Sequence, residues 1–187
     1  MYDLNDFCMD AKTVLTTQNG DDARETIRQN LEKLLKNEGL ISSICKEDAE
    51  VGAHVLYEDE ELGFVVLNHI NEKGRQSPPH DHGESWAIYG QAVGHTDMRE
   101  FERLDDETPD GTADVKMVRE YRLTPGHAGM FGPRQIHAIN FIDGSRFIRV
   151  TGTDLSKIST RKFDMEAGTV TEVPATVGSL GAGGSAE

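Results

Sequence analysis

The stretch Ser77–Gly83, which reads SPPHDHG, holds the residues of this chain whose types and spacing best suit chemistry. His80 and His82 are separated by one residue, and in an extended segment residues i and i+2 point to the same face. Both imidazoles can therefore bind one divalent metal ion. Pro78 and Pro79 stiffen the approach to this pair and withhold backbone N–H donors.

A third nitrogen ligand must come from elsewhere in the chain. The stretch Pro125–Asn140, PGHAGMFGPRQIHAIN, is a turn rich in Gly and Pro that leads into a strand, and His137 stands where that strand begins. The sequence therefore predicts a metal site with the ligands His80, His82 and His137. For His95 and His127, surface positions are favoured over a role in orienting these ligands.

The N-terminal part of the chain must help to position these residues, and it is helical in pattern. The sequence predicts a short helix near 3–17 and a firmer one near 22–37, in which Ile27, Leu31, Leu34 and Leu35 recur at three- and four-residue steps. Asn37 and Gly39 are expected to end the second helix. We expect this segment, residues 1–40, to pack on the main domain.

From residue 50 onward, short strand-like segments follow one another, each rich in β-branched or aromatic residues and bounded by turn residues. They cover 53–59, 62–70, 85–104, 114–124, 127–132, 136–142 and 146–155, and a closing hairpin is predicted over 160–173. Many short strands joined by turns indicate a sandwich or barrel. We predict a β-barrel domain over 41–174 and a flexible tail over 175–187.

Composition limits the partners of the protein. The 187 residues fit one domain with appendages, and the formal net charge of −14 disfavours nucleic acid and anionic membranes as partners. The sequence has no apolar run long enough to cross a bilayer, and its two cysteines form no CxxC motif. A cytoplasmic protein is expected, with a small molecule as its partner. The sequence does not determine the oligomeric state.

The HDH stretch, followed by Trp86, Gly90 and Gly94 and then by Pro125–Asn140, resembles the two conserved motifs of the cupins. The resemblance covers about half of the chain, from Leu62 to Thr153. It implies a mainly β fold, a double-stranded β-helix (jelly-roll) barrel, preceded here by helices. Among cupins the chain is most similar to the cysteine dioxygenase-like thiol dioxygenases, in which three histidines bind ferrous iron and leave positions open for a thiol and dioxygen. This resemblance maps the iron ligands onto the same three histidines.

The chain departs from that family where substrate is recognised. Many cupins have a glutamate ligand four or five residues after the second histidine, and here Trp86 and Ala87 occupy those positions. The arginine that clamps the substrate carboxylate in mammalian-type cysteine dioxygenases would fall on His54, and the cysteine of their thioether crosslink on Ala87. The resemblance therefore implies a retained metal site, with free L-cysteine not the expected substrate.

The resemblance implies an Fe(II)-dependent dioxygenase of the thiol-dioxygenase type that acts on a small molecule, with His54, Trp86 and Tyr89 as candidates for the substrate wall. Zn, Ni and Mn are alternative metals, since imidazole binds all of them. Two other functions stay open: a metal-dependent isomerase, lyase or hydrolase, and a non-catalytic cupin that binds a small ligand. The arginines nearest the predicted strand ends are each expected to be exposed to solvent; they are Arg75, Arg134 and Arg149.

Overall fold

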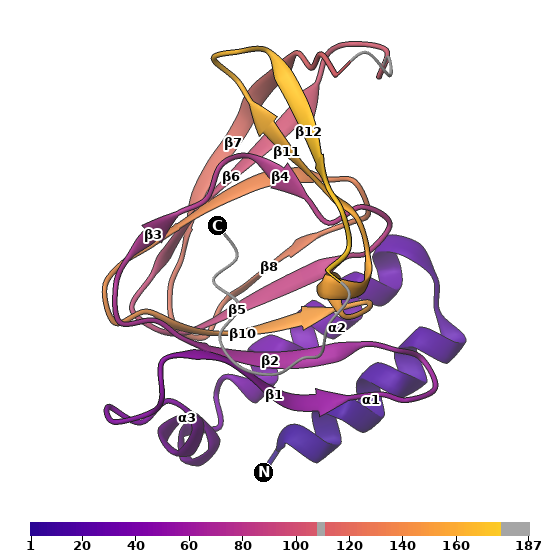
Figure 1. Cartoon of the computed structure of the whole chain (residues 1–187). Coiled ribbons are helices and arrows are strands. Elements are labelled where there is room, and N and C mark those ends of the chain that lie inside the picture. Colours follow the sequence, from indigo (N-terminus) through magenta and orange to yellow (C-terminus); the bar gives the residue numbers. More distant parts are fainter. Residues whose placement is uncertain (108–110, 177–187) are drawn as a thin grey trace.

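The computed structural model describes residues 1–107 and 111–176. Within these ranges the chain forms three N-terminal helices and two antiparallel sheets (Figure 1). The tail predicted over 175–187 lies outside the described residues from position 177 onward. No helix in the described part of the chain is long and apolar enough to cross a membrane.

The three helices are α1 (Leu4–Thr17), α2 (Gly20–Leu34) and α3 (Glu38–Ile44). The prediction of two helices is confirmed in its essentials, but α2 ends three residues earlier than expected. Asn37 follows the end of α2 and also begins the next helix, because its side chain accepts a hydrogen bond from the Leu40 backbone N–H at 3.0 Å. It therefore caps a third short helix that the sequence pattern did not predict.

The first sheet has the strand order β1-β2-β10-β5-β8. Its strands are β1 (Gly52–Glu58), β2 (Val65–Ile70), β10 (Arg146–Thr151), β5 (Ala87–Val93) and β8 (Ala128–Phe131). The second sheet has the order β12-β11-β4-β9-β6-β7, and β3 pairs with β9 beside this path. Its strands are β3 (Arg75–Gln76), β4 (His80–Asp81), β6 (Thr96–Arg103), β7 (Val115–Leu123), β9 (Ile136–Phe141), β11 (Thr160–Asp164) and β12 (Thr169–Val173).

The chain passes repeatedly from one sheet to the other, and the two sheets face each other as a jelly-roll-like sandwich. The predicted mainly β jelly-roll with N-terminal helices is therefore confirmed. The closing hairpin is confirmed as β11 and β12. The segment 85–104 contains two strands, β5 and β6, which belong to different sheets.

The first sheet is covered on both faces. Its outer face packs against α1 and α2, where Leu31 and Phe7 share a buried cluster with Ile88, Ile148 and Val150 (Figure 1). Gly90 of β5 permits this close approach, since a Cβ atom at Gly90 would lie 2.8 Å from Leu31 Cδ2. The inner face forms a second buried cluster with the other sheet. The residues of that cluster are Ala87, Tyr89, Met98, Leu123, Phe131, Phe141 and Phe147.

Candidate metal centre

The HDH segment is held in place by its central residue. Asp81 is fully buried, and its Oδ1 accepts hydrogen bonds from the backbone N–H groups of Gly83 at 3.0 Å and Arg161 at 3.1 Å. Its Oδ2 accepts from Arg161 Nε at 2.6 Å. Because side chains alternate along an extended segment, these bonds turn Asp81 away and leave His80 and His82 on the opposite side.

The turn after the segment requires glycine. Gly83 has a φ of +54°, and a Cβ atom there would lie 2.5 Å from the Ser159 carbonyl oxygen. The Gly83 carbonyl accepts from the backbone N–H of Arg134 at 2.8 Å, and Arg134 Nε donates to Glu84 Oε1 at 2.6 Å. These contacts join the HDH turn to the turn that precedes β9.

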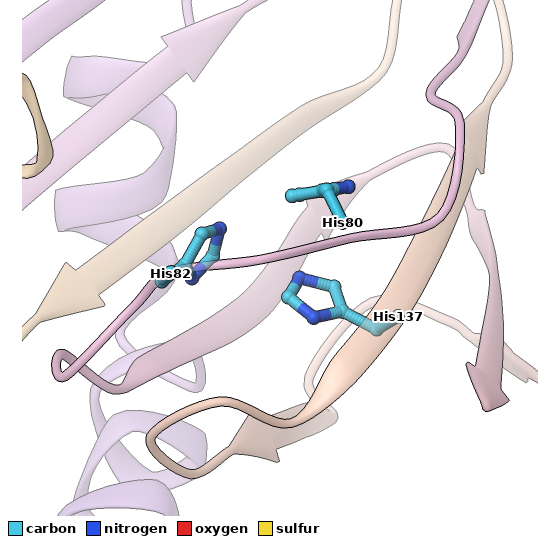
Figure 2. Close-up of side chains that lie close together, drawn as sticks. All are labelled: His80, His82 and His137. Carbon is cyan, nitrogen blue, oxygen red and sulfur yellow. The ribbon is translucent and has the colours of Figure 1, made fainter. Parts of the chain in front are cut away.

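Strand pairing brings the third histidine to the other two. β4 runs antiparallel to β9, and the register places His80 opposite His137. The ring centroids lie 4.5 Å apart for His80 and His137, 4.8 Å for His82 and His137, and 5.2 Å for His80 and His82. One nitrogen from each ring lies within 4.8 Å of the others. Figure 2 shows His80 and His82 on one segment with His137 on the neighbouring strand.

Hydrogen bonds fix which ring nitrogen is available to an ion. The Nδ1 of His80 lies 2.9 Å from the Pro78 carbonyl oxygen, and the Nδ1 of His137 lies 3.1 Å from the Gln135 carbonyl oxygen. A carbonyl oxygen can only accept, so each Nδ1 carries the proton and each Nε2 keeps its lone pair. The Nε2 of His137 is buried with no hydrogen-bond partner among the described residues.

The three rings are neutral at physiological pH. Burial is the largest cause that lowers the pKa of His80, and it lowers the pKa values of His82 and His137 well below 6.5. The neighbouring histidines lower the pKa values of His82 and His137 further. A neutral imidazole is the form that binds a metal ion, so these residues fit a divalent ion such as Fe, Zn, Ni or Mn.

Two aromatic side chains line the histidine cluster. Phe131 stacks on His137, with ring centroids 3.9 Å apart and an interplanar angle of 5°. The Tyr89 ring lies 6.0 Å from His137 and 6.4 Å from His82. Tyr89 is therefore the one of the three proposed wall residues that the structure brings to the histidines.

His54 and Trp86 lie elsewhere. The register pairs His54 with Asn68, whose side chain donates to the Ile44 carbonyl, so His54 lies on the face of the sheet that carries the helices. Its Nε2 lies 2.7 Å from the Glu50 carbonyl oxygen. Trp86 is also on that side, where it packs against the helix-facing cluster. Neither residue joins the histidine cluster.

The other histidines and arginines singled out in the sequence analysis differ in their exposure to solvent. His127 is exposed and lies 3.2 Å from Thr124 Oγ1, while His95 is half-buried. Arg75 and Arg134 are exposed, as expected. For Arg149 the expectation of solvent exposure is wrong, because Arg149 is half-buried and its Nε is fully covered. The sequence analysis also missed Arg161, which anchors Asp81 from 80 residues away.

No protein-family model and no curated protein matches the sequence. Solved structures resemble the fold at low identity. A cupin superfamily protein from Desulfitobacterium hafniense is 16% identical, with 62% of this chain and 88% of that chain covered and a TM-score of 0.41. The Cnp3 cupin domain of Schizosaccharomyces pombe is 12% identical, with 57% and 66% covered and a TM-score of 0.41. KdgF from Halomonas sp. is 16% identical, with 53% and 74% covered and a TM-score of 0.40.

Proposed function

We propose that this protein is a metal-dependent enzyme that acts on a small molecule, and that its chemistry is that of an Fe(II) thiol dioxygenase. One observation carries the proposal: three neutral histidines, two of them buried and His80 half-buried, hold one nitrogen each within 4.8 Å of the others, and the hydrogen bonds of His80 and His137 leave Nε2 free. Buried polar atoms without partners are costly, so such an arrangement is retained where a ligand satisfies them.

A bound ferrous ion would supply the one-electron chemistry with dioxygen that no side chain can perform. The protein's residues would hold the site around it. His80, His82 and His137 would bind on one side only, and their neutral rings would leave the positive charge available to an anionic substrate group. Phe131 and Tyr89 are both buried, and they would keep bulk water away from that side of the histidine cluster.

The reaction balances without a further reductant. A thiol R–SH and one O2 give the sulfinic acid R–SO2H, so the S–H bond breaks, two S–O bonds form and the proton ends on the sulfinic acid. Sulfur loses four electrons, and the O2 molecule takes them up. A thiol substrate therefore needs no electron donor besides itself.

The test begins with metal content. His80→Ala, His82→Ala and His137→Ala should each lose most of the bound iron after anaerobic loading, and His127→Ala should keep it, because His127 is exposed and is not one of the three clustered histidines. The iron-loaded wild type should then consume oxygen with at least one small thiol.

The outcomes separate the candidate functions. Full iron occupancy in His137→Ala would contradict the assignment of the third ligand. Tight metal binding without oxygen uptake for any thiol would favour the metal-dependent isomerase, lyase or hydrolase.

A further inference from the structure

The second sheet ends in a strand whose outer edge is open. β7 is the last strand of that sheet and lies next to β6 (Figure 1). Among the described residues, no backbone group of another strand pairs with the far edge of β7. Residues 116–120 are exposed in an unbroken run, and Met117 and Val118 are each 46% exposed. A long, open edge strand of this kind is a place where another strand can add.

The edge strand β8 of the first sheet is occupied instead. The backbone N–H of Ala128, on β8, donates to Glu32 Oε1 at 3.0 Å. The carbonyl oxygen of Ala128 accepts from Arg28 Nη1 at 3.3 Å. Both side chains come from α2, so this helix takes up hydrogen-bonding groups that a further strand would use. Strand addition is therefore blocked at β8 and open at β7.

One face of β6 and β7 carries unlike charges in register. Asp97 lies opposite Arg122, and Arg99 lies opposite Glu120. Arg122 Nε donates to Asp97 Oδ1 at 2.6 Å, and Arg99 Nε donates to Glu120 Oε1 at 2.7 Å. The side chains of Glu120 and Arg122 nevertheless stay 50% and 55% exposed. Each therefore still offers its charge to a strand beyond the edge of the sheet.

A second copy of β7 matches this edge in one register. Two identical antiparallel strands related by a two-fold axis place one residue opposite itself. With Tyr121 on the axis, Glu120 of each copy lies opposite Arg122 of the other. With Arg119, Glu120 or Arg122 on the axis, like charges face each other there. An axis at or before Val118 would pair the copies through a bulge, because Val118 has no partner on β6.

We propose that two copies of this chain pair through β7 around a two-fold axis at Tyr121. The inference goes beyond the proposed metal chemistry and does not depend on it. The pairing forms two rows of alternating charge across four strands. Each row contains, in order, Asp97 and Arg122 of one copy and Glu120 and Arg99 of the other. Charge networks of this kind contribute to stability where an isolated surface ion pair contributes little.

The composition of the strand also suits a second copy. Three of the nine residues of β7 are basic and one is acidic, although the chain has a net charge of −14. β7 is therefore a place where two acidic proteins can meet with less repulsion than their net charge implies. The pairing covers only Arg119–Leu123 of each copy, so we expect a dimer that forms in a concentration-dependent manner.

The first test is the oligomeric state. Sedimentation equilibrium of the wild type should show a monomer–dimer equilibrium between about 1 µM and 1 mM. Glu120→Arg and Arg122→Glu should each raise the dimer Kd at least about 10-fold, because like charges then face each other in both rows. Glu102→Arg is the matched control, because Glu102 is exposed on β6 and its replacement changes the net charge as Glu120→Arg does. It should keep the wild-type Kd.

An equimolar mixture of Glu120→Arg and Arg122→Glu tests the register. In a mixed pair the first variant offers two positive charges at these positions and the second offers two negative charges. Unlike charges then face each other in both rows. The mixture should therefore dimerise, while each variant alone stays monomeric at the same concentration.

Disulfide formation tests the position of the axis. A residue on the axis lies opposite itself with its Cα atoms about 4.5 or 5.5 Å apart, which a disulfide can span. Tyr121→Cys should therefore give a covalent dimer on mild oxidation. Arg119→Cys should not, because its two copies are offset by four residues, roughly 13 Å. The native Cys8 and Cys45 are buried, so they give little background.

A wild type that stays monomeric at about 1 mM would overturn the proposal. Unchanged dimerisation in Glu120→Arg, or an equal loss in Glu102→Arg, would overturn β7 as the interface. A covalent dimer of Arg119→Cys without one of Tyr121→Cys would overturn the register. If Tyr121→Cys does not fold, the mixture decides, and the lack of a mixed dimer would overturn the register equally.

Discussion

Replacing Asp81 with Asn should destabilise the protein and weaken metal binding together, although Asp81 contacts no metal. The substitution keeps the size of the side chain but removes its charge. Oδ1 can still accept from the backbone N–H groups of Gly83 and Arg161. The new amide, however, places a second donor against Arg161 Nε, which lies 2.6 Å from Oδ2.

The magnitude follows from burial. Asp81 is 0% exposed and the Arg161 side chain is 21% exposed, so the substitution breaks a largely buried ion pair. Removing one partner of a buried pair costs about 3–5 kcal/mol, and the partial exposure of Arg161 places the expected loss near the lower value, about 3 kcal/mol. The matched control is Asp97→Asn. Asp97 pairs with Arg122 at 2.6 Å, but Arg122 is 55% exposed, so the expected loss is about 0–1 kcal/mol.

The assay is urea unfolding of the metal-free proteins, followed by competition for Co(II) against a chelator of known affinity. Asp81→Asn should lose both stability and cobalt affinity, since freeing the segment lets His80 and His82 leave their common orientation. Asp97→Asn should lose at most about 1 kcal/mol of stability and keep the wild-type cobalt affinity. If the two variants lose the same small stability, or if Asp81→Asn keeps wild-type cobalt affinity, then Asp81 does not position the histidines.

Two further predictions concern the core and pH. Leu31→Ala should lower the free energy of unfolding in urea by about 2–5 kcal/mol, because Leu31 is fully buried where α2 packs on the first sheet. The control is Gln29→Ala, which should change that free energy by less than about 0.5 kcal/mol because Gln29 is exposed. Equal losses in the two variants would show that α2 is not part of the core. Burial, Arg149 and His54 lower the pKa of His69 well below 6.5, so its contribution to stability is present above pH 6.5 and is lost as pH falls below it, by at most about 1.4 kcal/mol per pH unit. Metal-free His69→Gln should therefore lose less stability than wild type between pH 7 and pH 5.5, with exposed His127→Gln as the control; parallel curves would contradict this assignment.

The three-histidine cluster could be predicted from the sequence because most of the information for it lies in a short stretch of the chain. The HxH spacing of His80 and His82 places both rings on one side of the segment whenever that segment is extended, whatever the rest of the fold. His137 could be added through a resemblance of motifs, although the pairing of β4 with β9 that brings it opposite His80 is visible only in the structure. The helices could be predicted for the same local reason, since their apolar spacing is intrinsic to the sequence.

Which side chains of the first sheet face the histidine cluster could not be predicted, because both faces of this sheet are buried. In RFIRVT, Phe147 and Ile148 are both buried but face opposite sides, so the pattern does not show which face carries Arg149. The same ambiguity affects Trp86 and Tyr89, of which the first packs under the helices and the second faces the histidines. The spacing seen in the cysteine dioxygenases aligns their arginine clamp with His54, but His54 lies on the helix-facing side of the first sheet.

An anionic substrate is compatible with the acidity of the chain. The formal net charge of −14 is spread over the whole protein, and at physiological ionic strength its field decays over about 8 Å. Inside the sandwich the balance is reversed: the three histidines are neutral, the buried carboxylate of Asp81 is matched by Arg161, and Arg149 keeps an unpartnered Nε. A divalent ion bound by the three histidines would add two further positive charges there. Because buried charges are screened much less than surface charges, this local field would outweigh the acidity of the surface and favour an anionic ligand at the histidine cluster.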